Sequence, residues 1–197
     1  MIMENRVQRF KKALFLDRDG VINEERNYVY RRQDFILIDG VIDAVRLAKD
    51  YGYAIAVVSN QAGIARGYYG VEDVRALHAH MLQLFLEAGA SIDAIYFCPH
   101  HPDGIVRDYA VKCYCRKPYP GMISRAAAEL EINLWESVLV GDKLSDIQAG
   151  VSAGVGKNCL VGVQPEDSIP TGKLKYLRYA NLRQAVAHCC TADSLAG

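Results

Sequence analysis

Short apolar runs alternate with amphipathic stretches along the chain. Residues 54–58 form a continuous, largely β-branched run, which is typical of a strand buried on both faces of a parallel sheet. Residues 41–50 place Val41, Val45 and Ala48 on one face, which indicates a helix. The same reading predicts further strands at residues 13–16, 94–97, 138–140, 158–161 and 176–179, and further helices at residues 71–88, 121–130, 144–153 and 182–188.

The alternation of strand and helix predicts an α/β fold. The pattern favours a three-layer, Rossmann-like doubly wound parallel sheet with helices on both faces. A chain of 197 residues suffices for one well-cored domain, so we expect a single domain over residues 1–197. Residues 1–12 are expected to be a frayed lead into the first strand, and residues 191–197 are expected to be disordered.

The first predicted strand ends at Asp17 and Asp19, which are followed by a turn at Gly20. Ligands of an open parallel sheet bind beyond the carboxyl ends of its strands. Two crowded carboxylates repel each other unless a cation lies between them, and Mg²⁺ prefers oxygen ligands together with a substrate phosphate. The residues after Asp19 do not have the spacing of an EF-hand loop. Taken alone, the motif is equally compatible with a polar turn.

Three more polar motifs follow predicted strands or precede a proline. Ser59 and Asn60 end the second strand and offer a hydroxyl, an amide and backbone N–H groups to a phosphoryl oxygen. Asp142 and Asp146 follow the fourth strand, where either could also cap a helix. Two cations at residues 116–117 suit an anionic substrate. Each motif alone is weak, but their order along one sheet favours a phosphate-binding catalytic site.

Composition limits the partners that the protein can attract. The 23 lysines and arginines balance 23 aspartates and glutamates, so no net charge draws the protein to nucleic acid or to an anionic membrane. No stretch reaches the roughly 20 apolar residues of a membrane span, and the first residues lack the apolar core of a signal peptide. We therefore expect a cytoplasmic, monomeric protein whose cysteines stay reduced.

The irregular segment after the third strand holds three of the six cysteines and two histidines. Reduced cysteines that cluster favour a metal site over disulfides. Cys98 and His100 form one pair of ligands, and Cys113 and Cys115 form another, which together supply a closed tetrahedral zinc site. A full ligand set leaves no open position for water, so this zinc is expected to be structural. His101 is the rival of His100 as a ligand.

The remaining cysteines and helix histidines have simpler interpretations. Cys159, Cys189 and Cys190 are expected to pack as small hydrophobic residues. His78 and His80 lie in the helix predicted at residues 71–88, where we expect them on the surface rather than bound to a metal.

Together these motifs resemble those of the haloacid dehalogenase superfamily of aspartate-nucleophile phosphatases, over residues 13–161. The four superfamily motifs correspond to Asp17-x-Asp19-Gly20, Ser59, Lys117, and Gly141-Asp142-x-x-x-Asp146. More narrowly, residues 15–23, 59–67, 98–102 and 113–118 look like the family of D-glycero-D-manno-heptose 1,7-bisphosphate phosphatases. The histidinol-phosphate phosphatases, which have a similar zinc loop, are the alternative. Val21 and Ser59 stand where many members have Thr, and neither change removes a required group.

The resemblance implies Mg²⁺-dependent removal of the C7 phosphate of heptose 1,7-bisphosphate through an aspartyl phosphate, in nucleotide-activated heptose biosynthesis for lipopolysaccharide core or related glycans. Asp17 is then the nucleophile, and Asp19 is the general acid and base. Ser59 and Lys117 neutralise charge on the phosphoryl oxygens, while Asp146 orients Lys117. The implied Mg²⁺ ligands are Asp17, Asp19 through its backbone carbonyl, and Asp142.

The resemblance also favours His100 over His101 as the zinc ligand and implies where the rest of the substrate binds. The implied substrate-binding residues are Arg18, Glu25, Arg26, Asn27, Tyr28, Asn60, Gln61, Ala62, Arg116 and Lys143. The short gap between Asp19 and the first helix leaves no room for a cap domain, so we expect an open, capless site.

Two other classes of protein explain less of the sequence. A phosphate-sensing module without turnover would most simply have lost Asp17 or Asp19, and both are present. A zinc-dependent interaction module would explain the cysteines but not the acids at the strand ends.

Overall fold

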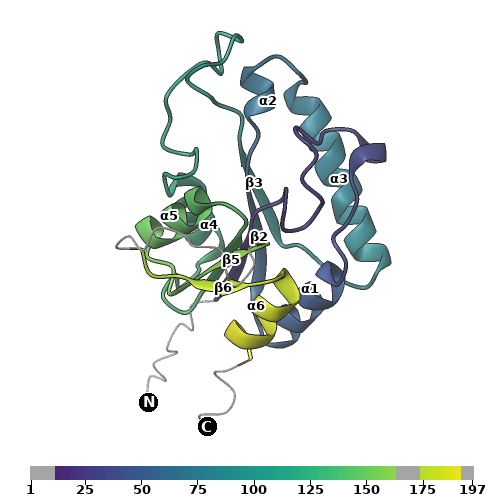
Figure 1. Cartoon of the computed structure of the whole chain (residues 1–197), viewed down its shortest axis with the longest axis vertical. Coiled ribbons are helices and arrows are strands. Elements are labelled where there is room, and N and C mark those ends of the chain that lie inside the picture. The colour runs from purple at the N-terminus through teal and green to yellow at the C-terminus, as the bar shows by residue number, and fades with distance from the viewer. Residues whose placement is uncertain (1–11, 163–173, 192–197) are drawn as a thin grey trace, which may run out of the picture.

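Six parallel strands form one sheet in the computed structural model, which describes residues 12–162 and 174–191 (Figure 1). The strands are β1 (Ala13–Leu16), β2 (Ala54–Asn60), β3 (Ala94–Cys98), β4 (Val138–Gly141), β5 (Lys157–Val161) and β6 (Leu177–Tyr179). Their order across the sheet is β3-β2-β1-β4-β5-β6. The strand β1 is therefore central, and the order of strands reverses on its two sides, which is where open α/β sheets bind ligands.

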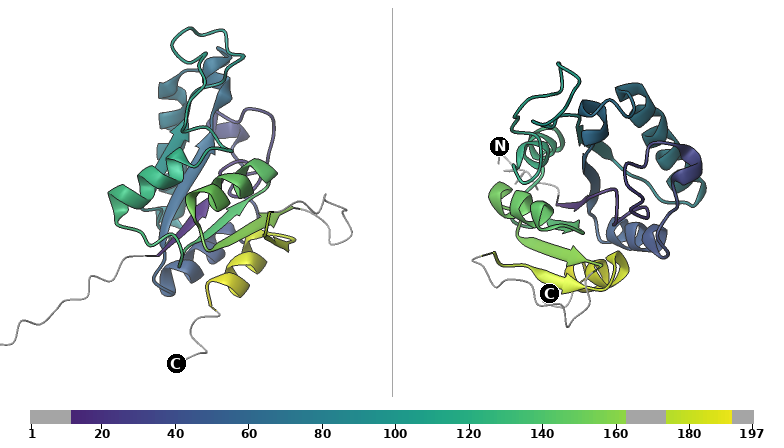
Figure 2. Two further views of the ribbon diagram at one scale, coloured as in Figure 1. Left: turned by 90° about the vertical axis from the view of Figure 1, so that its left-hand side faces the viewer. Right: turned by 45° about the horizontal axis from the view of Figure 1, so that its top comes forward.

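Helices cover both faces of the sheet (Figures 1 and 2). On one face lie α1 (Val41–Asp50), α3 (Val71–Glu87) and α6 (Leu182–Cys189), and on the other lie α4 (Gly121–Leu130) and α5 (Leu144–Ala153). These are the helices and strands that the periodicity predicts, with bounds that agree to within about two residues. The predicted three-layer, doubly wound arrangement is confirmed.

The side chains of β1 show why both faces need cover. Leu14 and Leu16 point into the core beneath α1, α3 and α6, whereas Ala13 and Phe15 point into the core beneath α4 and α5. All four are fully buried, because successive side chains of a strand alternate between the two faces. Each buried Leu or Phe stabilises the fold by about 1.5–3 kcal/mol relative to an exposed one. This central strand fixes the position of the residues that follow it.

Two short elements were not predicted from the sequence. The helix α2 (Ala62–Ala65) follows β2 directly, and a 3₁₀ helix, η1 (Arg32–Asp34), lies between β1 and α1. Both are shorter than the window over which a helical period can be recognised. The expectations of a frayed start at residues 1–12 and a disordered end at residues 191–197 fall mainly on residues outside the described part of the chain.

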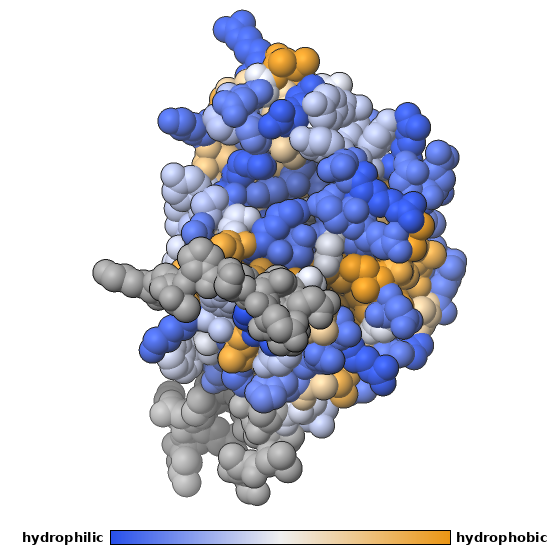
Figure 3. Space-filling view, viewed as in Figure 1, coloured by the Kyte–Doolittle hydropathy of each residue, from blue (hydrophilic) through white to orange (hydrophobic). Residues whose placement is uncertain are grey.

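The face of the molecule seen in Figure 3 is mainly polar. Figure 3 shows hydrophilic residues over the middle of the face in view, with hydrophobic residues gathered in smaller groups. Within residues 12–162 and 174–191, no helix is long and apolar enough to cross a membrane.

Candidate active site

The ends of β1 and β4 bring three carboxylates together. Asp17 follows β1, and its N–H donates to the carbonyl of Val140 in β4 at 3.0 Å. Asp142 follows β4, and Asp146 lies in the first turn of α5. Carboxylate oxygens of the three aspartates lie within 4.8 Å of one another. The parallel pairing that sets Leu16 opposite Val140 thus gathers the acids at one edge of the sheet.

The Lys117 ammonium lies between two of these acids. Its Nζ is 2.8 Å from Oδ1 of Asp17 and 2.7 Å from Oδ1 of Asp146, and it donates to the carbonyl of Val58 at 2.8 Å. Burial alone lowers the pKa of a lysine, but Asp17 and Asp146 outweigh it and raise the pKa of Lys117. The side chain is therefore a charged group held inside the protein.

Asp146 has two partners that explain its burial. Its Oδ1 pairs with Lys117, and its Oδ2 accepts a hydrogen bond from the N–H of Lys143 at 3.0 Å. The second contact caps the start of α5. The helix-cap interpretation and the Lys117-orienting interpretation therefore hold together.

The carboxylates fit a divalent cation. Burial raises the pKa of Asp17 to about 7, against the opposing effect of Lys117, and burial also raises the pKa of Asp142. Among the described residues, Oδ1 of Asp142 is buried and has no hydrogen-bond partner. A hard cation would favour the ionised forms and occupy that oxygen. The carboxylate of Asp19 lies outside this cluster, so its share in metal binding, through the backbone carbonyl, stays a prediction.

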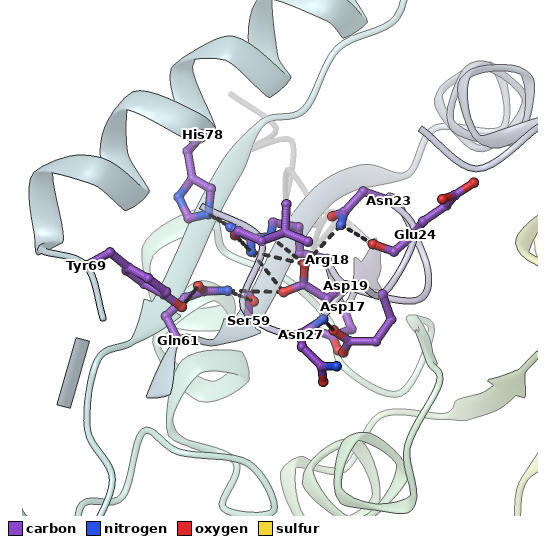
Figure 4. Close-up of polar contacts among 12 residues, drawn as sticks. Asp17, Arg18, Asp19, Asn23, Glu24, Asn27, Ser59, Gln61, Tyr69 and His78 are labelled. Carbon is purple, nitrogen blue, oxygen red and sulfur yellow. Dashed lines mark hydrogen bonds and ion pairs between the residues drawn. The ribbon is translucent and has the colours of Figure 1, made fainter. Parts of the chain in front are cut away.

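Asp19 is held by donors from three directions (Figure 4). Nη2 of Arg18 lies 3.0 Å from its Oδ1 and 2.9 Å from its Oδ2. Nδ2 of Asn23 donates to Oδ1 at 3.0 Å, and Nε2 of Gln61 donates to Oδ2 at 3.3 Å. These contacts fix the direction in which the carboxylate faces the cavity.

Gln61 also links Asp19 to the phosphate-binding end of β2. Its Nε2 donates to Oγ of Ser59 at 2.8 Å, and its Oε1 accepts from the hydroxyl of Tyr69 at 2.9 Å (Figure 4). Tyr69 was not predicted as a site residue, because nothing in the sequence distinguishes it from a core tyrosine. Its burial raises the pKa of its hydroxyl to about 12, so it stays a neutral donor.

An open cavity of about 320 Å³ lies over these groups. On one wall, Nζ of Lys143 pairs with Oε2 of Glu25 at 2.9 Å. Most of the predicted catalytic and substrate-binding residues meet there. The lining is formed by Asp17, Asp19, Glu25, Asn27, Tyr28, Ser59, Asn60, Gln61, Ala62, Tyr69, Arg116, Lys117, Lys143 and Asp146.

Two predicted substrate-binding residues do not line this cavity. Arg18 is fully buried, because its guanidinium is bound by Asp19, His78 and the carbonyl of Val29 rather than facing the cavity. Arg26 is exposed and pairs with Glu24 at 2.7 Å instead. Neither side chain lines the cavity in this structure, and their assignment as substrate-binding residues stays a prediction.

The expectation that His78 lies on the surface is wrong. His78 is only 6% exposed, and its Nε2 lies 3.3 Å from Nη1 of Arg18. The signal was present in the sequence, because His78 lies in the helical stripe with Val74, Leu77 and Met81, which α3 buries against the sheet. His80 is half-buried, with its ring 6.3 Å from that of Phe35.

The predicted zinc ligands lie together at the end of β3. Sγ of Cys115 is 3.2 Å from Sγ of Cys98, 3.3 Å from Sγ of Cys113 and 3.4 Å from Nδ1 of His100. Sγ of Cys98 is 3.5 Å from Sγ of Cys113 and 3.7 Å from Nδ1 of His100. Ligands at normal zinc bond lengths in a tetrahedron lie roughly 3.3–3.8 Å apart. The distances of 3.2–3.7 Å between these ligand atoms are close to that spacing, so the four residues could hold a metal ion, and zinc stays a prediction. His101 instead accepts a hydrogen bond from the N–H of Asp103 at 3.1 Å.

The loop that carries these ligands is tied to the sheet beside the acids. Oδ1 of Asn60 accepts from the N–H of Lys117, and Nδ2 of Asn60 donates to the carbonyl of Lys117, both at 3.1 Å. Nη1 of Arg116 donates to the carbonyl of His100 at 3.3 Å. The two bonds between Asn60 and Lys117 join the end of β2 to the residue that neutralises Asp17.

Known proteins share this fold and much of this sequence. A model of HAD-hydrolase-like proteins matches residues 114–168, which carry Lys117 and the aspartates after β4. A HAD-like phosphatase from Mesorhizobium loti is 34% identical, with a TM-score of 0.81 over 92% of this chain and 87% of that one. The sheet and its strand-end acids therefore define a HAD-like hydrolase.

Curated relatives narrow this class. The D-glycero-β-D-manno-heptose-1,7-bisphosphate 7-phosphatase of Yersinia pestis is 47% identical over 149 residues, 76% of this chain and 79% of that protein. The D-glycero-α-D-manno-heptose-1,7-bisphosphate 7-phosphatase of Burkholderia mallei is 49% identical over 150 residues, which are 76% of this chain and 79% of that protein. The chain belongs to the family of heptose-1,7-bisphosphate 7-phosphatases. None of these relatives is a histidinol-phosphate phosphatase, so that alternative has no support.

One similar solved structure was determined with a metal ion and phosphate bound. The D,D-heptose 1,7-bisphosphate phosphatase of B. bronchiseptica, complexed with magnesium and phosphate, is 29% identical, with a TM-score of 0.80. The match covers 92% of this chain and 99% of that one.

Proposed function

We propose that the protein releases the C7 phosphate of D-glycero-D-manno-heptose 1,7-bisphosphate, with Mg²⁺ held by Asp17, Asp142 and the backbone carbonyl of Asp19. The observation that carries the proposal is the ammonium of Lys117 held between Asp17 and Asp146 in an open cavity. A carboxylate beside a fixed positive charge supports the proposal, because the carboxylate can attack phosphorus while the charge stabilises the phosphoryl oxygens. The names of the relatives, and the magnesium and phosphate in a family structure, support the same reaction.

The residues divide the reaction into two displacements. When bound, Mg²⁺ would supply positive charge opposite the phosphoryl oxygens. An oxygen of Asp17 attacks phosphorus, the bond from phosphorus to the C7 oxygen breaks, and Asp19 gives its proton to that oxygen. Asp19 then takes a proton from water, whose oxygen attacks the aspartyl phosphate, releases inorganic phosphate and restores Asp17. Ser59 and Lys117 hold the phosphoryl oxygens in both steps.

The walls of the cavity suit a substrate with a second phosphate. Arg116 and Lys143 line the cavity and add positive charge beyond that of Lys117. A guanidinium binds phosphate through two parallel N–H bonds, so Arg116 is the better candidate for the C1 phosphate. A substrate held in this way presents C7 to Asp17.

Zinc in the cysteine loop would have a positional role in this proposal. Cys98, His100, Cys113 and Cys115 fill a tetrahedral shell and leave no position for water. Arg116 and Lys117 follow Cys115 directly, so ordering of the loop orders both cations.

Phosphate release from a panel of substrates tests the proposed function. The panel contains the α and β anomers of heptose 1,7-bisphosphate and histidinol phosphate, assayed with and without Mg²⁺. We expect Mg²⁺-dependent release from at least one heptose anomer, with a kcat/KM at least about a hundredfold above that for histidinol phosphate, because the second phosphate supplies binding energy. Preference for histidinol phosphate would overturn the proposal, and the ratio of the two anomers identifies the natural substrate.

A further inference from the structure

His78 is a buried titratable side chain that the proposed reaction does not use. Its ring packs edge-on against Phe97, with centroids 5.5 Å apart, and its Nε2 lies 3.3 Å from Nη1 of Arg18. An arginine only donates hydrogen bonds, so Nε2 of His78 must accept this one. Burial and the charge of Arg18 lower the pKa of His78 to about 3, so the ring is neutral and its nitrogen is free to accept.

Arg18 connects this histidine to the site. Its guanidinium is fully buried and has three kinds of partner: Asp19, His78 and the carbonyl of Val29, to which Nη2 donates at 2.6 Å. The side chain thus spans from α3 to the loop after β1 (Figure 4). A buried donor left without a partner is costly, so loss of any one contact favours a different position of the guanidinium.

We propose that His78 is a positioning residue for the general acid, acting through Arg18. His78 fixes one edge of the guanidinium, and the opposite edge fixes the carboxylate of Asp19, which reaches the cavity. His78 lies outside the lining of the cavity and outside the cluster of metal-binding acids. Its effect is therefore on proton transfer to the leaving oxygen rather than on substrate binding. The inference rests on the phosphatase activity proposed above.

The size of the effect is limited by the other donors to Asp19. Asn23 and Gln61 still hold the carboxylate when Arg18 shifts. A general acid contributes about a hundredfold to ten-thousandfold in rate, so a misdirected one should cost part of that factor, about tenfold to a hundredfold. The loss should be large for a sugar alkoxide, which needs a proton to leave, and small for an aryl phosphate, which does not.

The test compares three variants on two substrates. His78→Leu keeps the volume but removes the acceptor, His78→Gln restores an acceptor oxygen, and His80→Leu changes a histidine on the same helix that does not reach Arg18. On heptose bisphosphate we expect His78→Leu to lose kcat about tenfold or more with little change in KM. On p-nitrophenyl phosphate its kcat should stay within about threefold of wild type. His78→Gln should recover most of the loss, and His80→Leu should match wild type.

The outcomes are separable. Equal losses of His78→Leu on both substrates, no loss at all, or no recovery in His78→Gln would overturn the inference. If His78→Leu does not fold, Arg18→Met/His78→Leu removes the buried charge together with its partner, and wild-type kcat in that double variant would overturn it as well. Wild-type protein that fails to release phosphate from either heptose anomer contradicts the proposed function instead.

Discussion

At the scale of single residues, substitution of Asp17 gives the most direct test of the proposed chemistry. Asp17→Asn keeps the shape of the side chain but removes the attacking oxygen, so we expect turnover to fall by more than about a thousandfold. Because burial already disfavours the ionised carboxylate, the neutral amide should leave the fold intact. Phosphate release and circular dichroism measure the two effects. Asp43→Asn, at an exposed site on α1, is the control and should be fully active.

Gly20 offers a second test at this scale. Its φ is +82°, and a Cβ at this position would overlap the carboxylate of Asp142. Gly154 has a similar φ of +88°, but nothing lies within 4 Å of the place a Cβ would take. Gly20→Ala and Gly154→Ala should therefore each lose about 1–2 kcal/mol of stability from the backbone. Only Gly20→Ala should also weaken Mg²⁺ binding.

Denaturant unfolding and calorimetric titration with Mg²⁺ separate these two effects. Equal Mg²⁺ affinities in Gly20→Ala and Gly154→Ala would show that Asp142 does not bind the cation.

At the scale of elements, the sequence predicts the regular structure well and the side-chain contacts less completely. Long periodic stretches such as β2 and α3 follow from hydrophobic spacing, whereas α2 has four residues, too few to show a period. Strand-end acids such as Asp17 can be recognised because parallel strands end at a common edge. The burial of Arg18 could not be predicted, because its partner His78 is 60 residues away and reaches it only through the packing of α3.

The cysteine loop is the element whose order the proposed zinc would decide. Cys113→Ala removes one of four ligands, so we expect loss of zinc and of most activity on the bisphosphate, because Arg116 and Lys117 are no longer held. The sheet and helices should persist, since most of their buried side chains pack against one another rather than against the loop. Metal analysis, circular dichroism and kinetics measure the three expectations.

His101→Ala is the matched control for the cysteine loop. It lies in the same loop but outside the ligand cluster, so zinc and activity should be retained. Zinc-free Cys113→Ala protein with undiminished turnover would show that the loop does not position the site.

At the scale of the whole molecule, the site is open to solvent and no second domain covers it in the described residues. Specificity must then come from loop residues that line the cavity, such as Glu25, Arg116 and Lys143. The single domain over residues 1–197, the monomeric state and the cytoplasmic location remain predictions from the sequence.

An open cavity lined by Arg116 also predicts regiochemistry. With Arg116 on the C1 phosphate, the product should be heptose 1-phosphate, and ³¹P NMR of the reaction should show the C7 signal replaced by inorganic phosphate. Arg116→Lys should raise KM for the bisphosphate about tenfold while leaving aryl phosphate turnover near wild type, because lysine cannot make the paired contact. Accumulation of heptose 7-phosphate would contradict this orientation.

The central place of β1 has a consequence for how the protein is made. β1 leaves the ribosome first of the strands, yet it needs both β2 and the much later β4 to be covered on its two edges. Until residues 138–141 emerge, one edge of this fully buried strand is unpaired, and such edges recruit other chains. Asp17 meanwhile lacks Lys117, Asp142 and Asp146. Until residues 138–146 emerge, the newborn chain therefore carries Asp17, the proposed nucleophile, without the partners that hold it in the folded site, and chaperone cover should benefit it most in that period.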